Sequence, residues 1–125
     1  MIRVIDDLPA GAVGFSAIGV VTQEDYEDTI MPAVAAVIAM GEGLRLLYHF
    51  GPGFERFDSG ALWEDAILGY RHAFEWNRIA VVSDIEWIGF AVRAMHWMLP
   101  GKVRLYPDAQ MSDARAWLSE PHKDD

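Results

Sequence analysis

Two short apolar runs constrain the fold of this chain more than any other feature. Residues 44–50 (LRLLYHF) and 78–83 (RIAVVS) are nearly continuous in apolar side chains, which is typical of central strands covered on both faces. Segments with helical periodicity lie between them and beyond them. Strands separated by helices pair in parallel through right-handed crossovers, so the pattern predicts an α/β fold built on a largely parallel sheet.

Three further segments have the pattern of strands. Residues 2–6 alternate like a half-buried strand, and residues 12–20 form a second strand after a turn at 7–11. Residues 102–106 form the last strand. Because the opening pair is joined by a short turn, it adds an antiparallel edge, and the expected sheet is mixed and five-stranded.

Four helices are expected around this sheet. The first begins at Thr22, whose hydroxyl can accept a hydrogen bond from the amide of Asp25. Pro32 lies inside the same helix, where its missing amide proton is expected to bend the helix or leave a carbonyl without a partner. The other helices are expected at about residues 59–75, 84–99 and 110–119. The predicted element order is therefore ββαβαβαβα.

The composition fits a single domain over residues 1–119, followed by a flexible tail at 120–125. With 52% apolar residues, the chain can bury a core without a metal or a disulfide. It has no cysteine, which removes disulfides, zinc–thiolate sites and thiol nucleophiles and fits a cytoplasmic location. No signal-peptide pattern is recognised, and no apolar run approaches the roughly 20 residues that span a bilayer.

The net charge of −9 sets limits on partners. Only 10 residues are lysine or arginine, against 19 aspartates and glutamates, and the cations are scattered along the chain. Such a surface repels phosphate backbones, so nucleic acid is not an expected partner. Contact with anionic membranes is disfavoured for the same reason.

The ionisable residues do not indicate catalysis. The histidines are His49, His72, His96 and His122, and no pair has the spacing of a metal site. His49 could be combined with Asp58 and Ser59 as a triad, but no nucleophile elbow or oxyanion signature accompanies them. The chain is therefore expected to be non-catalytic, with no metal and no cofactor.

The helix expected at 84–99 is apolar on two sides. One stripe can cover the sheet and contains Ile88, Val92, Met95 and Leu99. A second apolar set lies elsewhere around the helix and includes Trp87, Phe90, Ala91, Ala94, Trp97 and Met98. A surface helix normally shows water a broad polar face, so this second set needs a cover. Neighbouring helices, a homodimer partner, an apolar ligand and a membrane interface are the alternatives.

The segment 51–60 is expected to be a loop after the carboxyl end of a central strand, where open α/β sheets place ligands. Phe54 and Phe57 in this loop either cover a pocket or pin the loop to the core, and both readings stay open. The residues expected to bind an apolar ligand are Phe54, Phe57, Trp63, Trp87, Phe90, Ala94, Trp97 and Met98.

Several short motifs resemble those of a known family. They are 63-WED-65, 78-RIAVVSD-84 running into Trp87, 102-KVRLYP-107 and 114-ARAWL-118. In order and spacing they cover about residues 2–119, and the chain resembles the SpoIIAA-like family of small bacterial proteins. That family is related to the STAS fold of anti-sigma-factor antagonists and is similar to the lipid-carrying CRAL-TRIO domains. The resemblance implies a STAS-like sheet with helices on both sides.

The resemblance also draws attention to Ser59. STAS antagonists carry a phosphorylatable serine at the start of the helix after the third strand, and 58-DSG-60 occupies a similar place. A helix start attracts phosphate, but the carboxylates of Glu55, Asp58, Glu64 and Asp65 would repel one here. A helix cap by Asp58 or Ser59 is the favoured reading of this motif.

Two functional hypotheses follow. The leading one is a non-catalytic binding module, a carrier or sensor of an apolar small molecule or lipid, with a homodimer through helix 84–99 as a further expectation. The alternative is a STAS-type regulatory protein that binds a protein partner and is switched by phosphorylation at Ser59.

Overall fold

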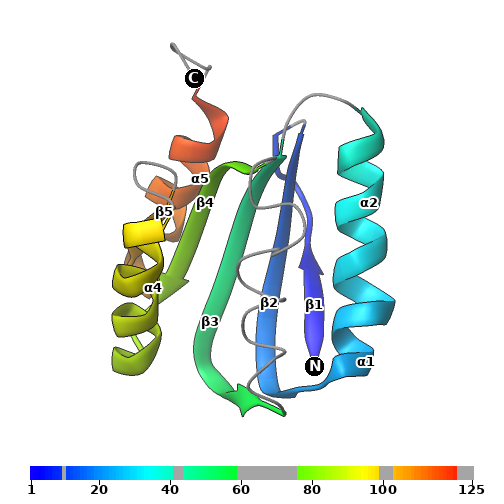
Figure 1. The fold of residues 1–125 in the computed structure, drawn as a ribbon. Coiled ribbons are helices and arrows are strands. Elements are labelled where there is room, and N and C mark those ends of the chain that lie inside the picture. Colours follow the sequence, from blue (N-terminus) through cyan, green and yellow to red (C-terminus); the bar gives the residue numbers. More distant parts are fainter. Residues whose placement is uncertain (10, 41–43, 59–75, 99–102, 121–125) are drawn as a thin grey trace.

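A computed structural model describes the chain except for residues 10, 41–43, 59–75, 99–102 and 121–125 (Figure 1). Its centre is a five-stranded sheet with the strands side by side in chain order, β1-β2-β3-β4-β5. The bounds are β1 Ile2–Ile5, β2 Ala12–Val21, β3 Leu44–Phe57, β4 Trp76–Ser83 and β5 Val103–Tyr106. β1 is antiparallel to β2 and the other pairs are parallel, which confirms the expected mixed sheet.

The described residues contain three helical segments rather than the four expected. A continuous helical run comprises α1 (Gln23–Asp25), η1 (Tyr26–Ile30) and α2 (Met31–Met40). α4 (Glu86–Met98) follows β4, and η3 (Asp108–Gln110) leads into α5 (Met111–Ser119). The helix expected at 59–75 lies outside the described residues, so the described order is ββαββαβα.

The first helical run begins where the sequence predicts. Thr22 and Asp25 form a capping box, in which the Thr22 hydroxyl accepts from the Asp25 amide at 3.1 Å and the Asp25 carboxylate accepts from the Thr22 amide at 3.0 Å. The helix then widens into a π-helix over Tyr26–Ile30, directly before Pro32. There the Met31 amide donates to the Tyr26 carbonyl, five residues back. This widened turn was not expected, and a bend at Pro32 or an unpaired carbonyl stays a prediction.

The segment expected to be a loop at 51–60 is instead the second half of β3 as far as Phe57. Phe54 pairs with Gly19 and Phe57 pairs with Val21, after a shift in register beyond Ala17. The GPG triplet at 51–53 is absorbed as a bulge at this shift. A bulge tolerates proline because an unpaired position needs no ladder hydrogen bond, so the turn-like sequence does not end the strand.

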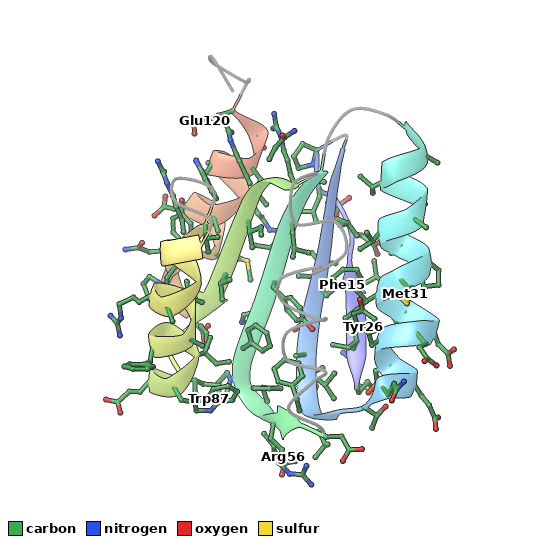
Figure 2. All side chains as sticks on the ribbon, in the orientation of Figure 1. Phe15, Tyr26, Met31, Arg56, Trp87 and Glu120 are labelled. Atoms are coloured by element: carbon green, nitrogen blue, oxygen red, sulfur yellow. The ribbon has the colours of Figure 1, made fainter. Side chains whose placement is uncertain are left out.

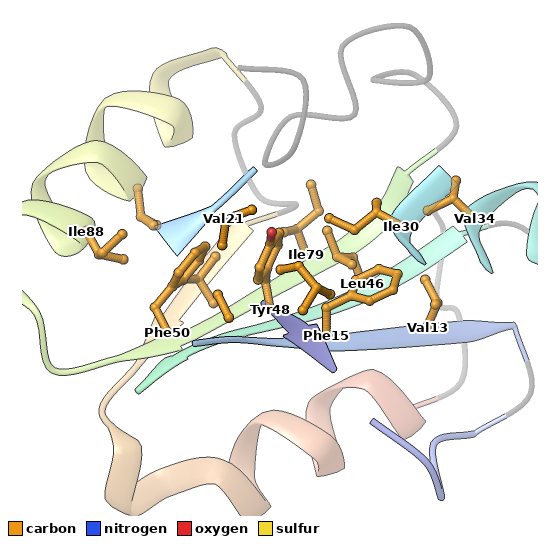
Figure 3. Packing of buried hydrophobic residues seen from close by; sticks show 14 of the residues in the cluster. Val13, Phe15, Val21, Ile30, Val34, Leu46, Tyr48, Phe50, Ile79 and Ile88 are labelled. Carbon is orange, nitrogen blue, oxygen red and sulfur yellow. The ribbon is translucent and has the colours of Figure 1, made fainter. Parts of the chain in front are cut away.

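The sheet is covered on both faces. The α1–α2 run and α4 lie on one face, over a cluster that includes Phe15, Tyr48, Phe50, Ile79 and Ile88, and α5 lies below the other (Figure 3). On the α5 face, Leu47, Ala80 and Val82 pack against Ala114, Trp117 and Leu118. Strands β3 and β4 therefore bury side chains on both faces, as their apolar runs predict.

Arginines of the sheet hold the carboxyl end of α5. Arg45 donates to the carbonyl of Leu118, and Arg78 donates to that of Trp117 at 2.6 Å. The guanidinium groups of Arg78 and Arg104 lie 5.6 and 4.6 Å from the centroid of the Trp117 ring. Cations at the negative end of a helix are stabilising, so these arginines fasten α5 to the sheet.

Candidate ligand-binding surface

A continuous series of aromatic rings leads from the core to the surface on the α4 side of the sheet. Phe15 lies 6.1 Å from Tyr48, and Tyr48 stacks on Phe50 with centroids 4.4 Å apart. Phe50 meets Phe54 at 4.9 Å, and Phe54 meets Trp87 of α4 at 5.8 Å. The Tyr48–Phe50 stack is just below the roughly 4.5–7 Å range of favourable aromatic pairs, and the other separations lie within it. Trp87 stands at the start of α4, near the carboxyl end of β3 (Figure 2).

The two apolar sides of α4 differ sharply in exposure. Ile88 and Val92 face the core, with 0% and 3% of their surface exposed. Trp87 is 45% exposed and Phe90 75% exposed, and Ala94 is exposed one turn further on. The second apolar set therefore opens to solvent at these three positions. The side chains of Trp97 and Met98 lie outside the described residues.

Phe54 and Phe57 do not project as a cover over a pocket. Phe54 is 6% exposed and belongs to the main core cluster, and Phe57 is half-buried against the same cluster. Their rings are 5.2 Å apart, and both residues pair with β2. These contacts hold the end of β3 to the core, and a ligand contact at either ring stays a prediction. Trp63, the remaining expected ligand contact, lies outside the described residues.

The hydroxyl of Tyr48 is a polar group in the buried part of the aromatic series. It is buried and has no hydrogen-bond partner among the described residues. Burial raises the pKa of Tyr48 well above its ordinary value, with smaller contributions from Tyr26 and Asp25, so the phenol stays neutral. A buried hydroxyl without a partner costs free energy, which makes this position a candidate for a functional contact.

The described part of the chain contains no group of three or more histidine, aspartate or glutamate residues arranged to hold a metal ion. None of its helices is long and apolar enough to cross a membrane.

The region before Ser59 is open and charged. Asp58 and Arg56 form an ion pair at 3.7 Å, with side chains 59% and 62% exposed. Ser59 itself lies outside the described residues, so neither its cap nor its phosphorylation is tested by the structure.

His49 has different neighbours from those considered in the sequence. Its ring contacts Ser16 of β2 on one side and Asp108 of η3 on the other, each at 3.3 Å. Sequence reasoning missed Ser16 and Asp108, because Ser16 is an isolated polar residue within one strand pattern and Asp108 follows another. Only the pairing of Ser16 with His49 in the parallel ladder reveals that they share a face.

Comparison with known proteins identifies the family. A family model described as SpoIIAA-like matches residues 12–119, which is most of the chain. The chain belongs to the SpoIIAA-like family. Among solved structures, this SpoIIAA-like chain is similar to an uncharacterized protein of the DUF3478 family from Shewanella loihica PV-4, whose crystal structure shows a SpoIIAA-like fold. The two are 26% identical with a TM-score of 0.74, over 94% of this chain and 93% of the other.

The comparison with curated proteins finds no match. The SpoIIAA-like fold favours a non-catalytic regulatory or binding module, and it indicates no particular ligand or partner. A fold alone does not define an activity, so the function has to be argued from the exposed aromatic residues and their surroundings.

Proposed function

We propose that this SpoIIAA-like domain binds an apolar small molecule or lipid on the outward side of α4, as a carrier or sensor. The observation that carries the proposal is the exposure of Phe90, 75% open to solvent, next to Trp87 at 45%. Isolated apolar residues on a surface are ordinary, but adjacent large aromatic rings on one helix face favour a binding surface. Covering them would remove apolar area from water and release free energy.

The surroundings of Trp87 support a binding role. Its ring rests on the buried ring of Phe54, so one side of the exposed indole is held by the core. A tryptophan fixed in this way loses little conformational freedom when a ligand covers it, which favours affinity. The net charge of −9 favours a neutral or cationic apolar molecule over an anionic one.

The proposal is tested first by native mass spectrometry of freshly purified protein. A bound apolar molecule appears as added mass on the monomer, whereas a homodimer appears as twice the chain mass. The second test is a titration with Nile red, a neutral apolar dye, against wild type, Trp87→Ala and Phe90→Ala. We expect dye affinity to fall in both variants.

The matched control for this titration is Val4→Ala, because Val4 is 50% exposed on β1, away from α4. Its dye affinity should equal that of wild type. Unchanged affinity in both Trp87→Ala and Phe90→Ala would contradict the ligand proposal. A dimer that dissociates in Phe90→Ala would instead assign the surface to a second copy of the chain.

The alternative proposal is a phosphorylation switch at Ser59 that controls binding of a protein partner. Support comes from the exposed Arg56, which lies in the segment before Ser59. Its guanidinium could bind a phosphate on Ser59 in place of the Asp58 carboxylate with which it is now paired. Stoichiometric phosphate at Ser59 in protein isolated from its native host would favour this alternative. Equal partner affinity of the unmodified and the phosphorylated protein would oppose it.

A further inference from the structure

Three polar residues of neighbouring strands lie side by side on the α5 face of the sheet. Arg3 of β1 is the register partner of Ser16 in β2, and Ser16 is the register partner of His49 in β3. Phe15 and Ala17, which flank Ser16, point into the core on the α4 side, so Ser16 points to the other face. This row is therefore separated by the sheet from the exposed aromatic residues of α4.

A chain of polar contacts extends from Ser16, of which the contact with His49 is a hydrogen bond. Its Oγ lies 3.3 Å from Nδ1 of His49, and Nε2 of the same ring lies 3.3 Å from Oδ1 of Asp108. The His49 and Asp108 side chains are each 25% exposed, and Ser16 is half-buried. The three groups are thus held by the fold and still reachable from solvent.

The neighbours of His49 determine which of its nitrogens carries the proton. We assign the proton to Nε2, because a lone pair there would face the Asp108 carboxylate and be repelled; Nδ1 then accepts from the Ser16 hydroxyl. The Nε2 contact has the distance of an ion pair without hydrogen-bond alignment, and Oδ1 receives no hydrogen bond from the described residues. Such contacts commonly tighten only when a substrate binds.

The surrounding backbone fixes this arrangement. A Cβ at Gly51 would lie 3.2 and 3.3 Å from Cε1 and Nε2 of His49, so glycine leaves the space in which the ring lies. The amide of Asp108 donates to Oδ1 of Asp84 at 3.1 Å, which ties the start of η3 to the end of β4. The space at Gly51 therefore positions His49, and the hydrogen bond to Asp84 positions Asp108.

Arg3 supplies a positive charge on the other side of Ser16. It is exposed and has no ion pair or hydrogen bond within the described part of the chain. Directly opposed residues of antiparallel strands have Cβ atoms about 4.5–5.5 Å apart, so its guanidinium can reach the atoms above Ser16. Because β2 is paired on both sides, its amides are committed to the sheet, and Arg3 is the candidate group to stabilise an oxyanion.

We propose that Ser16 is an activated nucleophile that accepts the acyl group of a small carboxylic ester. Ser16 Oγ attacks the ester carbonyl while His49 Nδ1 takes the hydroxyl proton, and Arg3 stands beside the developing oxyanion. The ester C–O bond then breaks, and the leaving alcohol takes the proton from His49. Water, deprotonated by His49, attacks the acyl-Ser16, releases the carboxylic acid and restores the hydroxyl. Asp108 stabilises the imidazolium in both steps.

The test uses p-nitrophenyl acetate and a fluorophosphonate probe on the full chain. We expect both reagents to modify Ser16, located by peptide mass spectrometry, and Ser16→Ala to abolish the modification. His49→Gln should slow acylation by about 100-fold or more, as loss of a general base does. Arg3→Gln should slow it by about 10-fold, less than the roughly 100- to 1000-fold typical of a buried oxyanion donor.

The matched control is Ser119→Ala, because Ser119 is an exposed serine whose hydroxyl donates to the carbonyl of Arg115 in its own helix. This variant should react like wild type. Asp108→Asn, which keeps the side-chain shape, should also slow acylation. Circular dichroism is the check that each variant is folded.

Equal modification of Ser16→Ala and wild type would overturn the proposal, as would wild-type rates in both His49→Gln and Asp108→Asn. Because the row lies on the opposite face from Trp87 and Phe90, none of these outcomes bears on ligand binding at α4.

Discussion

Trp87 lies against Phe54 with ring centroids 5.8 Å apart, although Phe54 is 6% exposed and Trp87 is 45% exposed. This contact joins the buried end of β3 to the solvent side of α4. Phe54 is buried in the core, whereas Phe90, one turn along α4 from Trp87, is exposed and belongs to the proposed binding surface. Substitutions at these positions should therefore separate stability from function.

Phe90→Ala should leave the fold nearly unchanged. With 75% of the side chain in water, its removal should change the free energy of unfolding by less than about 0.5 kcal/mol. The urea midpoint measures this effect. A large loss of stability would show that Phe90 is covered in solution and would remove it from the proposed binding surface.

Phe54→Ala should be strongly destabilising. The ring is buried and contacts Phe50, Phe57 and Trp87, so its loss should cost about 3–5 kcal/mol of unfolding free energy. That is a large part of the roughly 5–15 kcal/mol that holds a domain together. Urea denaturation provides the comparison with Phe90→Ala. A cost below about 1 kcal/mol would instead indicate a mobile cover.

Tyr48→Phe should not destabilise the protein. The substitution removes a buried hydroxyl that has no partner among the described residues, and it keeps the ring that stacks on Phe50. An unpaired buried polar group costs about 1–3 kcal/mol, so the thermal midpoint should be unchanged or higher. A clear fall in the midpoint would reveal that this hydroxyl has a hydrogen-bond partner in solution.

Asp25 should make stability depend on pH at the acidic end. Burial raises its pKa, but hydrogen bonds from Thr22 and the nearby ammonium of Met1 outweigh this and hold the pKa of Asp25 below its ordinary value of 3.8. A carboxyl with a lowered folded pKa stabilises the protein above its unfolded pKa, and this contribution is lost as the pH falls through the folded pKa.

The matched variant for this effect is Asp25→Asn. Wild type should be more stable than the variant above about pH 5, and the difference should shrink progressively as the pH falls below 4. Urea midpoints measured from pH 7 to pH 3 provide the test. A difference that stays constant across this range would show that the charge of Asp25 does not stabilise the cap.

Much of the sheet could be predicted because its signals are local. A strand covered on both faces needs apolar side chains on both faces, so the apolar runs predict β3 and β4. The capping box of Thr22 and Asp25 is equally local, since its partners are three residues apart. The end of β3 could not be predicted from the sequence, because the GPG triplet has the composition of a turn. The strand continues past it only because the residues beyond it pair with β2.

The candidate sites divide in the same way. Sequence periodicity alone determined that α4 has two apolar sides, because side chains repeat every 3.6 residues around a helix. The stripe expected to cover the sheet does so at Ile88, and only the tertiary structure decided that Phe90 on the second side is open to solvent. The pairing of Ser16 with His49, and the approach of His49 to Asp108, also came from the fold alone. Strand register joins the first two residues, and the chain beyond β5 brings Asp108 to His49. Local chemistry specifies elements, whereas contacts between distant segments depend on how the whole core packs.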